Sequence, residues 1–391
     1  MQKKIIALAV AGLVSGVAFA QTSVTLSGTV DVGYATGTDQ WKEGAGKQTN
    51  KYSNFRGGDS LGSSSSQLKM TVTEDMGNGL KAGYYHEIGL AQFANSDARN
   101  YNNVSDGVDE TVAAFNRTRQ SLVYLESAKL GRVQIGYMNE IIDDVSGAFQ
   151  TGSRNYVGLG YNAKFIENPV SNSGTTTPAV VAVGGTDYSR VNAFQYNTPV
   201  FSGFQGLAQF GQGKVDSEDT LSVQNTDNQA KYRHWALVGK YSNGPLGAML
   251  GYKKFTTDKS AVTVGTSDKD TYTSQAEWLA GVSYDFGVAK VTGMYFDRKA
   301  TKDVDNNFAL TSYSADGKYR GGDIGVTVPM GQFSLWANYA IAKHTFDDAD
   351  DGVNQYQFKI RGYQVGARYM LSKRTDVYAI YGRIKADGSN D

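Results

Sequence analysis

The chain has 391 residues, carries 38 acidic and 38 basic side chains, and contains no cysteine. The balanced charge argues against a nucleic-acid partner, which favours a basic domain, and the lack of cysteine excludes a disulfide scaffold, thiolate chemistry and Cys-ligated zinc. Glycine (46) and tyrosine (25) are frequent, whereas proline (5) is rare. This composition suits curved strands at a membrane interface, where a tyrosine ring lies among acyl chains with its hydroxyl in water.

The first twenty residues predict export. Lys3 and Lys4 form a positive start, residues 5–14 are apolar, and residues 18–20 (Ala-Phe-Ala) have the small-x-small pattern that signal peptidase cleaves. The alternative is a membrane anchor, but the apolar stretch is shorter than the roughly 20 residues of a spanning helix. We therefore expect residues 1–20 to be a cleaved signal peptide and 21–391 to form one domain.

From residue 22 onward, apolar and polar residues alternate with a period of two over about ten residues at a time. This is the pattern of a tilted strand that crosses a membrane. The even positions of 24–32 are apolar or glycine, as are Leu68, Met70 and Val72. The alternation predicts fifteen strands, near 22–35, 65–75, 80–90, 117–127, 130–138, 189–198, 203–213, 232–242, 246–256, 275–286, 287–298, 319–328, 331–343, 360–371 and 375–385.

The connections between these strands alternate in length. Tight turns are predicted near residues 76–79, 242–245, 286–287, 329–331 and 372–375. Long polar segments are predicted at 36–63, 91–116, 139–188, 214–231, 257–274, 299–318 and 344–359. Short turns on one side and long loops on the other are typical of outer-membrane barrels. The sequence thus predicts an all-β protein, a transmembrane antiparallel β-barrel.

Residues 18–26, 74–82 and 371–378 resemble the trimeric general porins of betaproteobacteria and Neisseria. The resemblance implies an outer-membrane homotrimer of barrels with about sixteen strands, each a water-filled channel for small hydrophilic solutes and ions, without a cofactor. It also implies that the third loop, about 139–188, folds into the lumen. Ser65, Ser66 and Gln67, and the pair Gly136-Tyr137, stand where the family carries pore-wall arginines, so the family's selectivity cannot be transferred.

An odd number of strands leaves the two chain ends on opposite sides of the membrane. Bacterial single-chain barrels have even strand numbers, because closure removes both sheet edges. We therefore expect that one final strand is missing from the sequence. The alternative is that a strand within 139–188 has been overlooked.

The candidate site is a set of charges around the lumen. Polar alternation places Lys69, Lys81, Arg132 and Arg368 on the inward pore wall, and Arg119 matches an arginine of the family. Glu140, Asp143 and Asp144 open the third loop. If that loop folds inward, its carboxylates face a basic wall, and such charges at a constriction set a transverse field and an ion preference. The alternative is that all of these are ordinary solvated charges.

Other kinds of site find little support. The three histidines, His86, His234 and His344, lie in no zinc spacing, and we expect no enzyme, metal or cofactor. The acidic cluster 347–351 could bind Ca²⁺, but its spacing departs from an EF-hand loop and favours a solvated loop tip. The alternative function is a surface-binding barrel, an adhesin or ligand receptor, with an occluded lumen. No loop resembles a binding motif.

Overall fold

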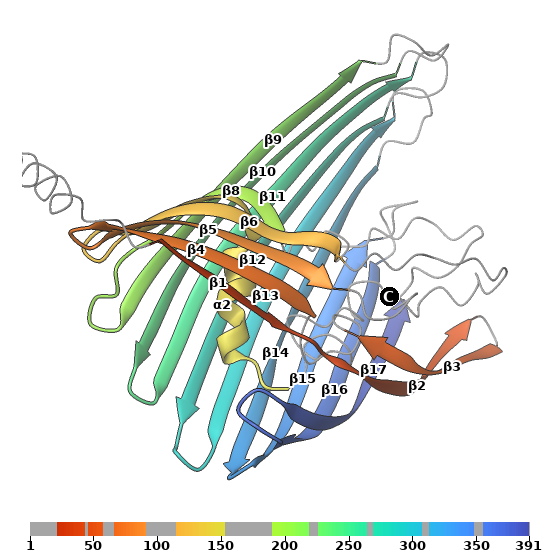
Figure 1. Ribbon diagram of the computed structural model, residues 1–391. Helices are drawn as coiled ribbons and strands as arrows, with labels where there is room; N and C mark the ends of the chain where they lie inside the picture. The colour runs from red at the N-terminus through yellow and green to blue at the C-terminus, as the bar shows by residue number, and fades with distance from the viewer. Residues whose placement is uncertain are drawn as a thin grey trace, which may run out of the picture.

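The computed structural model describes residues 22–43, 46–57, 66–90, 115–152, 190–218, 226–263, 269–306, 313–347 and 355–390. Fifteen strands form one antiparallel sheet in chain order, and β2 and β3 form a separate hairpin. The sheet curves into a trough around a short helix (Figure 1). The strands are β1 (Thr22–Thr29), β2 (Val32–Glu43), β3 (Gly46–Gly57), β4 (Gln67–Gly77), β5 (Leu80–Leu90), β6 (Phe115–Ser127), β7 (Gly131–Asn139), β8 (Arg190–Asn197), β9 (Phe204–Glu218), β10 (Thr226–Asn243), β11 (Leu246–Thr263), β12 (Lys269–Asp285), β13 (Lys290–Asn306), β14 (Tyr313–Met330), β15 (Phe333–Asp347), β16 (Gln355–Met370) and β17 (Asp376–Asn390).

Each of the fifteen predicted strands has a counterpart in the sheet, but several are longer than predicted. The five strands β10–β14 have 17 or 18 residues, whereas crossing the hydrocarbon takes about 9–11. Asp258 pairs with Tyr272, for example, inside the segment 257–274 that the sequence assigned to a loop. Beyond the apolar belt both faces meet water, so the alternation stops although the hydrogen-bonded ladder continues.

The first predicted strand, 22–35, is wrong in its extent. It breaks at residues 30 and 31, and the chain then forms the hairpin of β2 and β3 within the segment 36–63 that was predicted to be a loop. At the break Asp31 is buried, and its backbone N–H donates to Ser66 Oγ (3.0 Å). Most residues of the hairpin are polar or glycine, so its strands lack the sustained alternation on which the prediction depended.

Burial alternates along the strands as predicted. On β10 Leu237 is 54% exposed and the next residue, Val238, only 3%; on β11 Leu250 is 56% exposed and Met249 only 4%. The exposed set forms the outward face, and the buried set faces the helix inside the trough. Aromatic side chains on the outward face contact each other across strands, as in the pairs Trp235–Tyr252 and Tyr252–Trp278.

The sheet has β1 and β17 at its two edges. Just beyond the end of β1, Asp31 Oδ1 accepts a hydrogen bond from the hydroxyl of Tyr378 on β17 (2.7 Å). The prediction of a sixteenth strand stays a prediction. The predicted signal peptide, 1–20, and the acidic cluster beyond residue 347 lie outside the described residues. Among the residues described, no helix is long and apolar enough to span a membrane.

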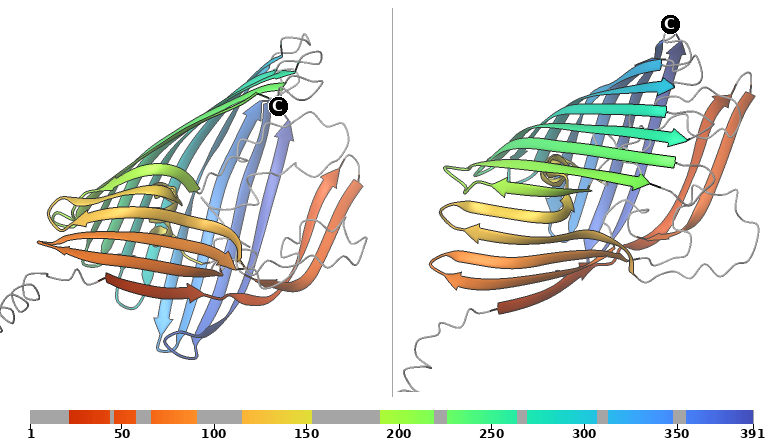
Figure 2. Two further views of the ribbon diagram at one scale, coloured as in Figure 1. Left: turned by 45° about the horizontal axis from the view of Figure 1, so that its top comes forward. Right: turned by 90° about the horizontal axis from the view of Figure 1, so that it is seen from above.

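The inner space of the trough is partly filled by α2 (Ile141–Ser146) and the 3-10 turn η3 (Gly147–Phe149). Figure 2 shows strands of the sheet on both sides of this segment. Residues 140–152 of the third long connection thus lie inside the trough. The rest of that connection lies outside the described residues, so the predicted inward fold of 139–188 stays a prediction.

We predict that single spin labels will distinguish the two faces. A label at Leu250 should be accessible to lipid-soluble oxygen, and one at Gln134, on the inward face, to a water-soluble nickel chelate, because the faces meet different solvents. The chain has no cysteine, so each single-cysteine variant is labelled at one position. Equal accessibility of both positions to oxygen would contradict the assignment of faces.

Candidate functional site

The helix inside the trough begins at a charged cap. The Glu140 carboxylate accepts hydrogen bonds from the backbone N–H groups of Ile142 (3.0 Å) and Asp143 (3.3 Å). These are two of the N–H groups that the first turn of a helix leaves without a partner. Asp143 and Asp144 follow in the same turn, where the positive end of the helix dipole stabilises negative charge.

Apolar side chains hold α2 and η3 against the wall. Ile141, Ile142 and Phe149 are at most 5% exposed. A Cβ at Gly251 would lie 3.0 Å from Ile142, and one at Gly281 would lie 2.9 Å from Phe149. Glycine at these two wall positions lets the segment approach the sheet closely. The wall residues in the same cluster include Leu207, Ala236, Val238, Met249 and Leu279.

A buried ion cluster, made of Glu140, Lys253, Glu277 and Arg298, joins the helix to β11, β12 and β13. Lys253 Nζ lies 3.1 Å from Glu140 Oε2 and 3.7 Å from Glu277 Oε2. Arg298 Nε donates to Glu277 Oε2 (2.8 Å). All four side chains are less than 10% exposed. Because water does not solvate them there, their two positive and two negative charges compensate each other. Moving the helix would leave buried charges unpaired, which is costly.

Neutral polar groups extend this cluster along the wall. His234 Nε2 lies 2.9 Å from Gln209 Oε1 and 4.0 Å from Glu140 Oε1. The Gln209 amide donates to the Asn139 carbonyl and to Gln195 Oε1, each at 2.9 Å. Hydrogen bonds to the wall therefore hold Asn139, just before the helix cap, in addition to the helix itself.

The same segment has a second anchor on the other part of the wall. The hydroxyls of Thr151 and Thr292 lie 2.7 Å apart. Gly152 has φ +89°, and a Cβ there would lie 2.2 Å from Gln364 Oε1, which accepts a hydrogen bond from Trp336 Nε1 (3.1 Å). Residues 140–152 therefore run across the inside of the trough, from β9–β11 to β15 and β16.

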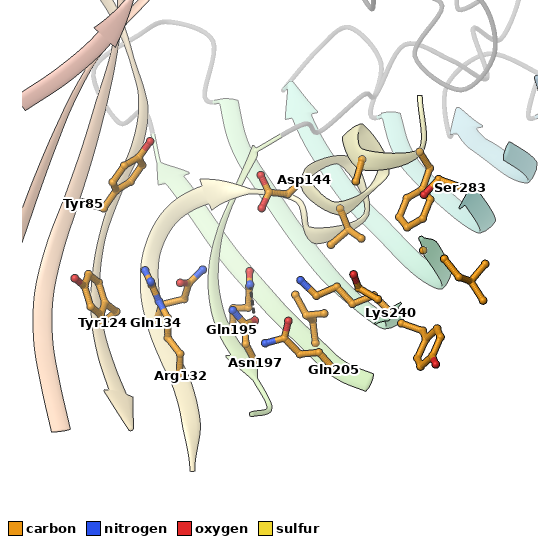
Figure 3. A pocket seen from close by; sticks show the side chains of 18 of the residues that line it. Tyr85, Tyr124, Arg132, Gln134, Asp144, Gln195, Asn197, Gln205, Lys240 and Ser283 are labelled. Carbon is orange, nitrogen blue, oxygen red and sulfur yellow. Dashed lines mark hydrogen bonds between the residues drawn. The ribbon is translucent and has the colours of Figure 1, made fainter. Parts of the chain in front are cut away.

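An open cavity of about 910 Å³ remains beside this segment. Asp144 reaches it from the helix, whereas Arg132, Gln134, Gln195 and Lys240 reach it from the wall (Figure 3). Carboxamides, hydroxyls and charged groups make up much of this lining, as expected for a space that holds water and polar solutes.

Opposite charges line the cavity. The charged residues of its lining are Arg132, Lys240, Lys290, Asp144 and Asp285. The Asp144 carboxylate accepts a hydrogen bond from Asn139 Nδ2 (3.2 Å), which orients it. The Arg132 guanidinium lies 3.9 Å from the centre of the Tyr124 ring, and Lys290 Nζ donates to the Ala148 carbonyl (3.3 Å). Negative charge on the helix thus faces positive charge on the wall.

The structure separates the three predicted loop carboxylates. Asp144 is exposed at the cavity. Asp143 is partly buried. Glu140, expected to face the narrowest water, is only 1% exposed. Because it caps the helix and pairs with Lys253, it positions the loop rather than lining the open water.

The predicted wall cations lie in different surroundings. Arg132 lines the cavity. Arg119 is the extra residue of a bulge between β5 and β6, and the bulge turns it inward, where Arg119 Nε donates to Glu87 Oε1 (2.6 Å). Lys69 pairs in register with the same Glu87. Lys81 is exposed near the turn after β4, and Arg368 Nε lies 3.4 Å from Asp376.

Some cations that lie beside the helix or line the cavity were not predicted from the sequence. They are Lys240, Lys253, Lys290 and Arg298. Alternation alone could have placed Lys253 on the opposite face of β11 from Leu250 and Tyr252. The inner face of β10–β12, however, is also apolar where α2 packs. The period of two therefore did not distinguish inside from outside there.

Comparison with known proteins gives consistent matches. A family model described as Gram-negative porin matches residues 7–389. Outer membrane porin protein 32 of Delftia acidovorans is 30% identical over 385 residues, which cover 98% of this chain and 89% of that protein. An outer membrane porin protein of Bordetella pertussis is 26% identical over 406 residues, with 98% of this chain and 94% of that protein covered.

Two solved structures share the fold. An anion-selective porin from Comamonas acidovorans has a TM-score of 0.58 and 23% identity, with 94% of this chain and 90% of that chain covered. The trimer form of in-vitro folded OmpT from Vibrio cholerae has a TM-score of 0.56 and 14% identity, with 93% and 89% covered.

We predict that Lys253→Met destabilises the protein by about 3–5 kcal/mol, because it leaves two buried carboxylates without their shared cation. The measurement is urea unfolding in detergent, followed by tryptophan fluorescence. Lys240→Met is the matched control, since it removes the same group from the open cavity, and we expect a change within about 0.5 kcal/mol. Equal losses in both variants would contradict an anchoring role for Lys253.

Proposed function

The chain belongs to the Gram-negative porin family, and on this premise we propose that Asp144 and the wall cations Arg132 and Lys240 form its ion-selecting constriction. As a porin of the outer membrane, the protein provides a water-filled channel through which small polar solutes and ions diffuse passively. The observation that carries the proposal is the presence of opposite charges on two sides of one open cavity.

A transverse field follows from this arrangement. A solute that passes between α2 and the wall has a carboxylate on one side and ammonium and guanidinium groups on the other. Few water molecules fit between them, so screening is weaker than in bulk solvent. The field orients dipolar solutes and favours those whose two ends carry opposite charges, while uncharged solutes that are too large are excluded by size.

We propose a modest preference for anions. Within the described lining of the cavity, three cations stand against two carboxylates, and one of these, Asp285, also accepts a hydrogen bond from the Gly287 N–H (2.8 Å). One of the structural neighbours is itself described as an anion-selective porin. The excess is a single charge, so both ion signs should pass.

Three further properties are part of the proposal. Residues 1–20 act as a signal peptide that is removed on export, and the mature domain assembles as a homotrimer, the state in which one structural neighbour was solved. Diffusion needs no catalytic group, and we assign no enzymatic activity. Cross-linking of the protein in outer-membrane vesicles tests the trimer, and products no larger than dimers would contradict it.

We predict opposite shifts of ion selectivity for Asp144→Asn and Lys240→Gln. A unit charge about 8 Å from an ion in water changes its free energy by roughly 0.5 kcal/mol, a factor of about two in relative permeability. Asp144→Asn should therefore raise the anion preference, and Lys240→Gln should lower it. The measurement is the zero-current potential of planar bilayers in a salt gradient.

The control for this pair is Asp387→Asn, which removes a carboxylate from the outward face of β17 and should leave the potential unchanged. Asp143→Asn should have a smaller effect than Asp144→Asn, because the Asp143 side chain is partly buried whereas Asp144 is exposed at the cavity. Shifts of the same sign for Asp144→Asn and Lys240→Gln would rule out the proposed field.

A further inference from the structure

Three side-chain carboxamides, those of Gln209, Gln195 and Asn197, form a hydrogen-bonded relay along the inner wall. Gln209 Nε2 donates to the Asn139 carbonyl and to Gln195 Oε1, each at 2.9 Å. Gln195 Nε2 donates in turn to Asn197 Oδ1 (2.8 Å; Figure 3). Gln209 and Gln195 are at most 5% exposed, whereas Asn197 is partly exposed at the cavity. The relay therefore runs from the start of the loop to open water.

A backbone carbonyl fixes the direction of this relay. Because the Asn139 carbonyl can only accept a hydrogen bond, the Gln209 group that faces it is the NH2 group. Gln195 then accepts through its oxygen and donates through its nitrogen, so the oxygen of Asn197 faces Gln195. The Asn197 NH2 group donates to no group within the described residues, and its N–H bonds are left for the cavity.

Arg132 lies beside the Asn197 amide. The two residues pair in register on β7 and β8 and both line the cavity, and the Cβ atoms of such a pair are about 4.5–5.5 Å apart. The Arg132 guanidinium contacts the Tyr124 ring and lies 3.6 Å from a Glu126 carboxylate oxygen, which is longer than an ordinary hydrogen bond. In the part of the chain that the structure describes, the guanidinium group thus remains available as a donor, next to the Asn197 amide.

The surrounding carboxylates indicate which anion fits these donors. Asp144 reaches the same cavity from the helix, as Figure 3 shows, and Glu126 lies beside Arg132. Both disfavour a second negative charge, because like charges repel at short distance. A phosphate group, with a charge of about −1.5 to −2, is therefore disfavoured compared with a carboxylate. Asp144 in turn attracts a positive group, so the solute that satisfies both sides carries one charge of each sign.

We propose that Arg132 and Asn197 bind the carboxylate of a small zwitterion, such as a free amino acid or a short peptide, whose ammonium group turns to Asp144. A guanidinium group matches the planar geometry of a carboxylate, and hydrogen bonds between charged groups are stronger than neutral ones. The proposal rests on the constriction proposed above. It adds a class of solute and a residue that determines specificity, Asn197.

The relay gives this subsite its selectivity for a carboxylate. A carboxamide that rotates freely offers its oxygen as readily as its NH2 group, and the oxygen repels a carboxylate. Gln195 holds the Asn197 oxygen away from the solute, and Gln209 holds Gln195. Both are positioning residues. Because the relay begins at the Asn139 carbonyl, the place of the loop also sets the chemistry of the wall opposite Asp144.

The test measures how three matched solutes block the KCl current of the full protein in planar bilayers. They are 4-aminobutyrate, pentanoate, in which a methyl group replaces the ammonium group, and butylammonium, in which a methyl group replaces the carboxylate. The readout is the solute concentration that halves the current. We expect this concentration to be about fivefold lower for 4-aminobutyrate than for the other two, because it alone makes both charge-assisted contacts.

Two variants of the same charge as the wild type test the donor. Asn197→Leu removes the NH2 group and should raise the half-blocking concentration of 4-aminobutyrate and pentanoate about fivefold, because a hydrogen bond to a charged group is lost. That of butylammonium should not change. The matched control is Gln134→Leu, which removes a carboxamide from the next row of the same cavity. Its effect on all three solutes should stay below about twofold.

Two further variants test the orientation of the amide. Asn197→Asp replaces the NH2 group by an oxygen, so it should weaken block by 4-aminobutyrate and strengthen block by butylammonium. Gln195→Met interrupts the relay but keeps Asn197, and block by 4-aminobutyrate should weaken by about half as much, on a logarithmic scale, as in Asn197→Leu. A disturbance of the channel as a whole would instead change all three solutes alike, and that result would contradict the proposal.

Equal block of the wild type by 4-aminobutyrate and pentanoate would overturn the zwitterion as the solute. Equal effects of Asn197→Leu and Gln134→Leu would overturn Asn197 as the residue that determines specificity. Either result could occur while Asp144→Asn and Lys240→Gln still shift the zero-current potential in opposite directions. The subsite would then fail and the proposed constriction would stand, so the two proposals are tested by different measurements.

Discussion

A strand that crosses lipid must satisfy every backbone N–H and C=O group through its neighbours, and the architecture follows from this constraint. Antiparallel pairing in chain order meets it with short turns on one side of the membrane. Because successive side chains point to opposite faces, one face can suit acyl chains while the other suits water. The polar backbone groups are thus hydrogen-bonded within the wall. The side chains alone determine the polarity of the surface that faces lipid and of the surface that faces water.

The inward loop is the part of the structure that this constraint does not explain. It is held by steric fit and by buried charge, with Ile142 and Phe149 against the wall glycines Gly251 and Gly281, and with Glu140 paired to Lys253. A buried ion cluster adds little net stability compared with an apolar one, but it strongly disfavours displaced arrangements. A constriction benefits from this, because the width and field of the channel depend on where the loop lies.

The sequence predicts the wall well and the constriction poorly, for a physical reason. Alternation is a local signal, so the strands and the outward residues, such as Leu335 and Tyr363, can be assigned without knowing any partner. The roles of Glu140 and Asp144 differ because one lies opposite Lys253 and the other faces open water, and that difference depends on residues more than 100 positions away. Arg119 needed the bulge to turn inward, which alternation cannot reveal. The hairpin β2–β3 was missed because most of its residues are polar or glycine, so no alternation extends over about ten residues.

Because of the same period of two, residues that are adjacent in the chain lie on opposite faces of the sheet and have different roles. Arg298 lies inside, where it neutralises Glu277 in the buried ion cluster, and Lys299 lies on the outward face. His344 is buried on the inward face, and Lys343 lies on the outward face. A slip of one residue in the register of β15 would exchange His344 and Lys343, which would place a lysine ammonium group in the buried inner wall and remove it from the outward face. The register of the sheet is therefore fixed by both of its faces: the inward face must fit the loop, and the outward face must suit the lipid.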